Sequence, residues 1–338
     1  MRPFDYQRAV DTATAAQVIG SSADGRAALN NGALQLLAGG TTLLDLMKLD
    51  VMRPTVLLDI TPLTPQWSAI SSSTDGLRLG ALAKMADAAE HDAVKRDYPV
   101  IAQSLQLAAS AQLRNMATLG GNVLQRTRCN YFRDVSYPNC NKRSPGSGCA
   151  AIGGVTRRHA VLGTSDACIA TYPGDFAQAL IALDANVDIA GRSGSRSIAF
   201  ADLHQAPGAT PHVETALMEG DVITGFRIPG RWPRSVYLKA RDRQSYEFAL
   251  ASAAVALDTA DGVVRDARIA IGGVATVPWR ARDAENVLKG KRLGETMALQ
   301  AGDAALQGAQ PQKDNGFKIA LGRQVVARAL LQAGKMEI

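Results

Sequence analysis

The sequence predicts a mixed α+β protein with two structural units. Its 338 residues exceed what one hydrophobic core usually organises. Strand-like and helix-like apolar segments alternate over residues 1–60. A breaker-rich stretch at 229–233 then precedes a part in which strands come first and helices follow. We therefore expect one unit over residues 1–228, with an insertion at about 126–168, and a second unit over residues 234–336.

An apolar strand, a diglycine turn and a helix occur early in the first unit. Residues 35–38 are expected as a buried strand, Gly39-Gly40-Thr41-Thr42 as the turn, and residues 43–48 as the helix. Glycines allow close backbone approach, and a threonine at the N-cap with free amides favours an anion such as phosphate. No lysine follows, so this is neither a Walker loop nor a GxGxxG fingerprint. An ordinary turn remains the alternative. Residues 56–60 predict another buried strand.

A second glycine motif follows a strand expected at 77–81 and helices expected at 84–96 and 99–111. Residues 112–123 contain the turn Gly120-Gly121, and Thr118 and Asn122 offer side-chain hydrogen bonds. Two glycine-rich turns in one domain could clamp a pyrophosphate from two sides. An ordinary helix-to-strand turn stays open, and it is favoured for Thr118 taken alone.

All four cysteines, Cys129, Cys140, Cys149 and Cys168, lie within forty residues, with the spacing Cys-x10-Cys-x8-Cys-x18-Cys. Without a CxxC pair, the local pattern of zinc knuckles and ferredoxins is absent. A [4Fe–4S] cluster takes four thiolates and tolerates irregular spacing when the fold positions them. Two disulfides are the main alternative, although residues 1–6 do not resemble a signal peptide, and a zinc site is the minor one.

The cysteine window is strongly basic, and its cations would favour an anionic cluster. Its glycine- and proline-rich residues 144–148 would let amides turn toward a sulfur. The net charge of +6 is modest, and no basic stripe interleaved with aromatic residues indicates nucleic acid. No apolar run is long enough for membrane insertion. The basic residues of the window are Arg126, Arg128, Arg133, Lys142, Arg143, Arg157 and Arg158.

The remaining elements complete both units. We expect a helix at 176–184 and strands at 187–190 and 221–224 in the first unit. In the second unit we expect a helix-prone segment at 245–252, followed by strands at 253–257 and 268–271 that a hairpin at 260–262 joins. Three helices are expected after them, at 281–289, 295–308 and 316–333.

Together these motifs resemble the FAD-binding medium subunits of the xanthine dehydrogenase and aldehyde oxidase family of molybdenum hydroxylases. AGGTTLLDLMK and QLRNMATLGGN stand where that family has its two flavin loops, and the resemblance covers essentially the whole chain. It implies a two-lobed FAD-binding domain of the vanillyl-alcohol-oxidase/PCMH type, followed by a domain like the C-terminal domain of CO dehydrogenase flavoproteins. The cysteine insertion is similar to that of the flavin subunits of bacterial periplasmic aldehyde oxidoreductases, which carry an extra [4Fe–4S] cluster.

The resemblance implies a role for each site residue. The first loop would wrap the FAD pyrophosphate, mainly through the backbone amides of residues 38–42. Asp175 would hydrogen-bond the cofactor or cap the following helix, Ile223 would touch the flavin through its backbone, and Lys239, otherwise expected at the surface, would reach the isoalloxazine. Tyr246 and Phe248 would cover the ring or pack in the core. The loop residues are Gln35, Leu36, Leu37, Ala38, Gly39, Gly40, Thr41, Thr42 and Leu43 on one side and Thr118, Gly121 and Asn122 on the other.

The implied function is electron transfer without a catalytic residue on this chain. Aldehydes would be oxidised to carboxylic acids on a large molybdenum-cofactor subunit. Electrons would pass through the [2Fe–2S] clusters of a small subunit to FAD, and on to an external acceptor. The resemblance also implies a heterotrimer exported to the periplasm by a partner's signal, with the cytoplasm as the alternative. A stand-alone flavin oxidase and a non-flavin metal-binding module are the other functions considered; neither a histidyl-FAD link nor a nicotinamide domain is expected.

Overall fold

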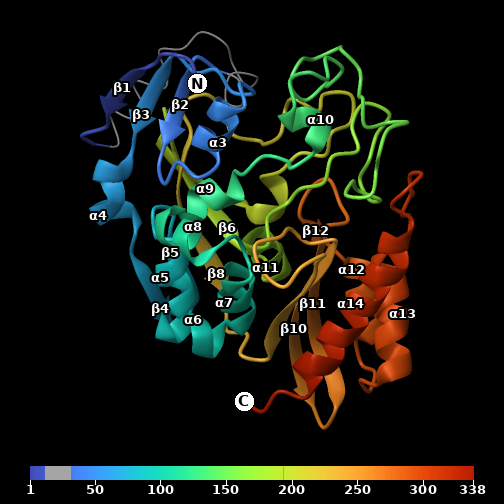
Figure 1. The fold of residues 1–338 in the computed structure, drawn as a ribbon. Helices are drawn as coiled ribbons and strands as arrows, with labels where there is room; N and C mark the ends of the chain where they lie inside the picture. Colours follow the sequence, from blue (N-terminus) through green and yellow to red (C-terminus); the bar gives the residue numbers. More distant parts are fainter. Residues whose placement is uncertain (12–31, 193) are drawn as a thin grey trace.

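The computed structural model describes residues 1–11, 32–192 and 194–338, and its elements form three sheets with helices packed against them (Figure 1). This mixed content confirms the predicted α+β class. Within the described residues no helix is both long and apolar enough to cross a membrane.

The first sheet is parallel, in the order β1-β3-β2, and carries α3 after its edge strand. The strands predicted at 35–38 and 56–60 and the helix at 43–48 are present, while residues 12–31 lie outside the described part of the chain. The leucines of β3 are buried because they alternate between two apolar clusters, one under each face of the sheet. The elements are β1 (Asp5–Arg8), β2 (Leu34–Leu37), α3 (Leu43–Lys48) and β3 (Val56–Asp59).

The second sheet is antiparallel, in the order β4-β5-β8-β6-β7. Its inward side chains share one apolar core with the helices that follow β5 and precede β6. The strands are β4 (Ile70–Ser73), β5 (Gly76–Gly80), β6 (Asn186–Gly191), β7 (Gly194–Ala199) and β8 (Val222–Pro229). The helices are α5 (Met85–Glu90), α6 (Asp92–Asp97), α7 (Pro99–Gln106) and α11 (Phe176–Ala182), with short turns η1 (Thr61–Leu63), α4 (Thr64–Trp67) and η2 (Phe200–Asp202).

Two helix predictions and one turn prediction in this region need correction. The helix expected at 84–96 is broken at His91, whose backbone is extended, and the helix expected at 99–111 ends at Gln106. A separate helix, α8 (Ala111–Met116), follows. The glycines of the second motif lie inside a short helix, α9 (Leu119–Val123), instead of forming a turn. Thr118 makes this possible, since its hydroxyl caps the first turn by accepting a hydrogen bond from the amide of Gly121 at 3.3 Å.

The third sheet is antiparallel, in the order β12-β11-β10-β9, and the three C-terminal helices pack with it in a second large core (Figure 1). The hairpin at 260–262 and all three helices are confirmed. The helix-prone segment at 245–252 is wrong: Tyr246 has a left-handed φ of 53°, and pairing with β9 draws the chain into β10 from Ala251. The elements are β9 (Ser235–Ala240), β10 (Ala251–Ala260), β11 (Val263–Gly272), β12 (Trp279–Arg280), α12 (Arg282–Leu288), α13 (Glu295–Ala305) and α14 (Phe317–Gly334).

The cysteine insertion is mostly irregular, with one short helix, α10 (Asn130–Arg133). The later part of the insertion reaches the third sheet. Val161 and Leu162 there belong to the second large core, and Leu162 forms a β-bridge with Ala275. The insertion therefore contacts both parts of the molecule and is anchored in the C-terminal core.

Candidate functional site

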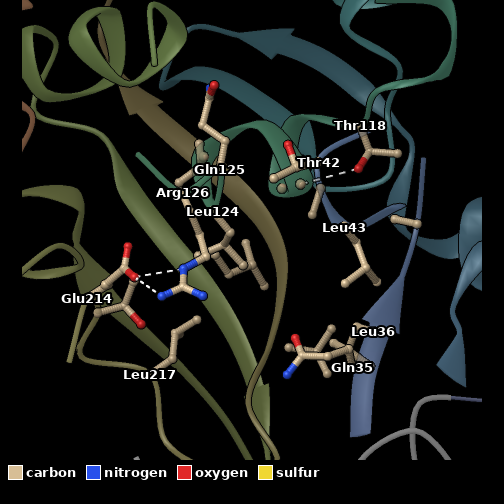
Figure 2. A pocket seen from close by; sticks show the side chains of 18 of the residues that line it. Gln35, Leu36, Thr42, Leu43, Thr118, Leu124, Gln125, Arg126, Glu214 and Leu217 are labelled. Carbon is tan, nitrogen blue, oxygen red and sulfur yellow. Dashed lines mark hydrogen bonds and ion pairs between the residues drawn. The ribbon is translucent and has the colours of Figure 1, made fainter. Parts of the chain in front are cut away.

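A cavity of about 230 Å³ opens where the first sheet meets the second. The β2–α3 loop forms one wall, α9 a second, and the start of β8 a third (Figure 2). The structure therefore brings together the two glycine motifs and Ile223, which are far apart in the sequence. The predicted residues that line it are Gln35, Leu36, Ala38, Gly39, Gly40, Thr41, Thr42, Leu43, Thr118, Gly121 and Ile223.

The two loops touch each other directly at Gly39. A Cβ atom at this position would lie 2.1 Å from the carbonyl oxygen of Met116, at the end of α8, so only glycine fits without displacement. Gly40 adopts a left-handed φ of 70°, which turns the chain toward α3. The side chain of Thr42 makes no capping hydrogen bond, unlike that of Thr118. The first loop therefore borders the cavity with the backbone of its two glycines and with the side chains of Thr42 and Leu43 (Figure 2).

Two predicted loop residues lie outside the cavity lining. Leu37 packs with the apolar cluster under α3. The amide nitrogen of Asn122 is 3.4 Å from the sulfur of Met85, while its side-chain oxygen is buried with no hydrogen-bond partner in the described structure.

Asp175 and Lys239 also lie outside the lining, and they bind each other. Lys239 Nζ donates to Asp175 Oδ2 at 2.7 Å and to the carbonyl of Leu107 at 3.1 Å, and both side chains are at least 96% buried. The hydroxyl of Tyr237 donates to the other carboxylate oxygen at 2.6 Å. Asp175 therefore does not cap α11, and Lys239 is not a surface residue. Their predicted contacts with the cofactor stay predictions.

The aromatic residues considered for the ring face lie elsewhere. Tyr246 is 56% exposed, so it does not pack in the core, and the Arg243 guanidinium lies over its ring. Phe248 is partly buried under the guanidinium of Arg128.

A second, smaller cavity is lined by all four cysteines together with aromatic and small residues of the insertion. The backbones of Cys140 and Cys149 pair in an isolated antiparallel β-bridge. Cys168, near the end of the insertion, lines the same cavity. The four thiols are free, so the two-disulfide alternative is not seen. Among the described residues, no three histidine, cysteine or acidic side chains are placed to hold a metal ion as they stand. The thiols thus border a shared cavity without closing on one ion.

Two family models together match nearly the whole chain. Residues 2–231 match the FAD binding domain in molybdopterin dehydrogenase, and residues 236–333 match the CO dehydrogenase flavoprotein C-terminal domain. The chain belongs to the FAD-binding medium subunits of the molybdenum hydroxylase family. It is 43% identical over 335 residues to the aldehyde oxidoreductase FAD-binding subunit PaoB of Escherichia coli, covering 98% of this chain and 99% of that protein.

More distant relatives span nearly the same length. The glyceraldehyde dehydrogenase medium chain of Sulfolobus acidocaldarius is 25% identical over 88% of this chain and 89% of its own. A solved structure of carbon monoxide dehydrogenase from Hydrogenophaga pseudoflava superposes with a TM-score of 0.75 at 25% identity. It covers 98% of this chain and 97% of that one. This medium subunit is therefore an FAD-binding oxidoreductase subunit. The larger of the two cavities is called the flavin cavity below, because it brings together the two motifs predicted to hold FAD.

Sequence reasoning did not place several charged residues in the wall of the flavin cavity. Arg126 Nε donates to Glu214 Oε1 at 2.8 Å (Figure 2). Lys142 Nζ lies 3.5 Å from Glu214 Oε2. Burial raises the pKa of the Glu214 carboxyl, but these two cations outweigh it and hold the pKa below its ordinary value. The signal was weak because Glu214 stands in an irregular loop, 88 residues from Arg126.

His204 also lines the cavity without having been predicted there. Its ring meets Tyr172 edge-on at 4.7 Å, and Nε2 lies 3.1 Å from the carbonyl of Val123. Burial lowers the pKa of this imidazole to about 4, so it is neutral at physiological pH.

In the cysteine cavity, burial outweighs the basic surroundings. It raises the pKa of Cys129 to about 12 and that of Cys168 above its ordinary value. Most of the predicted cations are compensated: Arg128 and Arg133 bind Asp45, Arg157 binds Asp242, and Arg158 binds Glu247. Cys129 and Cys168 are therefore protonated without metal, and metal binding must displace their protons.

Proposed function

We propose that this chain is the FAD- and [4Fe–4S]-carrying electron-transfer subunit of a heterotrimeric molybdenum aldehyde oxidoreductase. A large subunit would oxidise aldehydes to carboxylic acids, and electrons would reach this chain through the [2Fe–2S] clusters of a small subunit before leaving to an external acceptor. The observation that carries the proposal is the 43% identity to an aldehyde oxidoreductase FAD-binding subunit across nearly the full length of both chains.

The charges around the flavin cavity support electron transfer over substrate chemistry. Arg126 and Lys142 are engaged with Glu214, Asp221 binds Arg196, and His204 is neutral. None of these lining groups is a free acid or base poised for proton transfer to a substrate. When bound, FAD supplies the exchange between one-electron and two-electron transfers. The chain's own part is to hold it between the β2–α3 loop and α9.

The donor set of the second cavity supports the cluster. Four thiols border one enclosed space, and a cubane takes one thiolate for each of its irons. His159 Nε2 lies 3.2 Å from Cys129 Sγ, where an N–H could donate to a ligating sulfur. A zinc ion would instead need the four sulfurs to converge tetrahedrally on one point.

Anaerobic aldehyde reduction tests the proposal. The visible flavin absorption of the purified three-subunit complex should bleach on adding an aldehyde, whereas the isolated chain carrying FAD should not respond. Bleaching of the isolated chain would contradict the proposal and support the stand-alone flavin oxidase. Aldehyde turnover by the complex without bleaching would remove this chain from the electron path.

A further inference from the structure

Lys142 lines both cavities. It lies in the insertion two residues after Cys140, and it contributes to the wall of the four-cysteine cavity and to the wall of the flavin cavity. Its side chain is only 12% exposed. This one side chain therefore forms part of the wall of both cavities.

A hydrogen bond and ion pairs hold the Lys142 side chain in the wall of the flavin cavity. Its Nζ donates to the carbonyl of Pro211 at 3.0 Å and lies 3.5 Å from the carboxylate of Glu214. Glu214 in turn binds the guanidinium of Arg126, which is 5% exposed and lies 4.6 Å over the ring of Phe132 in α10. The contacts thus run from the insertion into the flavin cavity and back to the insertion.

Hydrogen bonds of the neighbouring Asn141 hold the backbone around Lys142 next to the four-cysteine cavity. The side chain of Asn141 accepts from the amide of Gly148 at 2.8 Å and donates to the carbonyl of Ala167 at 3.0 Å. These bonds tie the turn after Cys140 to the residues just before Cys149 and Cys168. The position of Lys142 therefore depends on how these cysteines are held.

A second attachment joins the insertion to the first flavin loop. Asp45 in α3 accepts hydrogen bonds from Arg128 at 2.9 Å and from Arg133 at 2.8 Å. Phe132 and Cys140 share one apolar cluster with Leu46 and Met47 on α3. The insertion and the helix that follows the diglycine turn are thus packed as one unit.

The charge balance between the cavities favours two anionic occupants. Arg126 and Lys142 carry two positive charges and Glu214 one negative charge, which leaves a net positive charge in a mostly buried wall. Without it, an anionic cluster and an FAD pyrophosphate would repel each other through a poorly screened medium.

From this geometry we propose that Lys142 is a positioning residue that couples the two sites, so that filling the four-cysteine cavity tightens the binding of FAD. The proposal rests on the proposed function, because it takes the iron–sulfur cluster as the occupant of the cysteine cavity. Coupling between sites is reciprocal, so bound FAD also stabilises the loaded insertion. Loading holds Cys140 and Cys149 in place, which orders Lys142 and keeps the Glu214 and Arg126 pair in the flavin wall.

Flavin titration of the full-length chain measures this coupling. FAD-free protein is prepared anaerobically with iron and sulfide reconstituted, and again after removal of iron by a chelator. Quenching of flavin fluorescence then gives the FAD dissociation constant for each form. We expect iron loading to tighten FAD binding about tenfold in the wild type. In Lys142→Gln the ratio of the FAD dissociation constants of the iron-free and iron-loaded forms should fall to about one, with iron content unchanged. Lys142→Arg keeps the positive charge and should retain part of the wild-type ratio.

The exposed Lys289, on the far domain, provides the matched control: Lys289→Gln should keep the wild-type ratio. Equal FAD affinity of loaded and iron-free wild type would overturn the inference while leaving the proposed function intact. A wild-type ratio in Lys142→Gln would show that coupling does not pass through Lys142. Wild-type protein that takes up no iron would sink the proposed cluster and the inference together. If Lys142→Gln itself loses iron, Glu214→Gln decides by the same ratio, since it leaves the insertion's side chains unchanged.

Discussion

The flavin cavity and the four-cysteine cavity share a wall, yet they present different atoms to their occupants. The flavin cavity is bordered by the β2–α3 loop and by α9, whose glycines bring backbone close, as at Gly39 against Met116. The cysteine cavity is bordered by four thiol side chains, one from each of four stretches of the insertion. Binding through many backbone groups is spread over the loops and limited by shape, whereas binding through four thiolates depends on each one.

The largest effect should follow from removing one thiol. Cys149→Ser should reduce the iron content from about four per chain to nearly none, because an alcohol is a poor ligand for iron–sulfur clusters. FAD should still bind, more weakly than in the wild type. Iron and FAD analysis of the anaerobically purified variant checks this, with Ser144→Ala at an exposed position of the same loop as control. Full iron content in Cys149→Ser would show that binding in the cysteine cavity does not depend on each of the four thiols.

A change outside both cavities provides the next largest effect. Lys239→Met should leave the buried Asp175 carboxylate without its cation and lower the free energy of unfolding by about 3–5 kcal/mol. Urea denaturation measures the loss, and Asp175→Asn combined with Lys239→Met should recover part of it. The FAD affinity of folded Lys239→Met separates the two roles of this lysine. A large loss of affinity would show that it contacts the flavin, as the resemblance implies.

Backbone approach in the flavin cavity is tested by a single methyl group. Gly39→Ala would place its Cβ 2.1 Å from the Met116 carbonyl oxygen and force the two loops apart. Overpacking of about 1–3 kcal/mol should weaken FAD binding roughly 10- to 100-fold and leave iron content unchanged. Gly294→Ala, where no atom lies within 4 Å, is the control. Unaltered FAD affinity in Gly39→Ala would show that the loop contact does not shape the site.

The smallest effect concerns pH. The pKa of His204 is about 4 in the folded chain and about 6.5 when unfolded, so the unfolded state binds more protons between these values. Stability from this residue is complete above pH 6.5 and is lost as the pH falls toward 4. This loss should lower the free energy of unfolding by about 1–2 kcal/mol between pH 7 and pH 5. Urea midpoints at both pH values should show a smaller difference for His204→Gln; an identical difference would exclude this contribution.

Local patterns carried much of the fold. The strands at 35–38 and 56–60, the helix at 43–48 and the hairpin at 260–262 follow from apolar runs, glycines and turn residues, which act over a few positions. The segment 245–252 failed because pairing with β9 overrides local helix preference. The glycines at 120–121 were expected in a turn, but the cap from Thr118 and contacts to Ala81 place them in a helix.

The candidate site divides in the same way. The two loops and the cysteines could be found from sequence because each is a compact motif. Glu214 and His204 could not, since they reach the cavity through tertiary contacts with residues about 80 or more positions away. Arg126 and Lys142 were noticed only as basic neighbours of the cysteines, and their position in the flavin wall required the fold.

Cofactor content tests the central claim most directly. Protein purified anaerobically as the full complex should contain, for this chain, one FAD and about four irons with matching acid-labile sulfide, beyond the iron of the small subunit. The full-length chain alone, reconstituted with iron, sulfide and FAD, should reach the same values. FAD without iron in the reconstituted chain would contradict the two-cofactor account and leave the cysteines to another role.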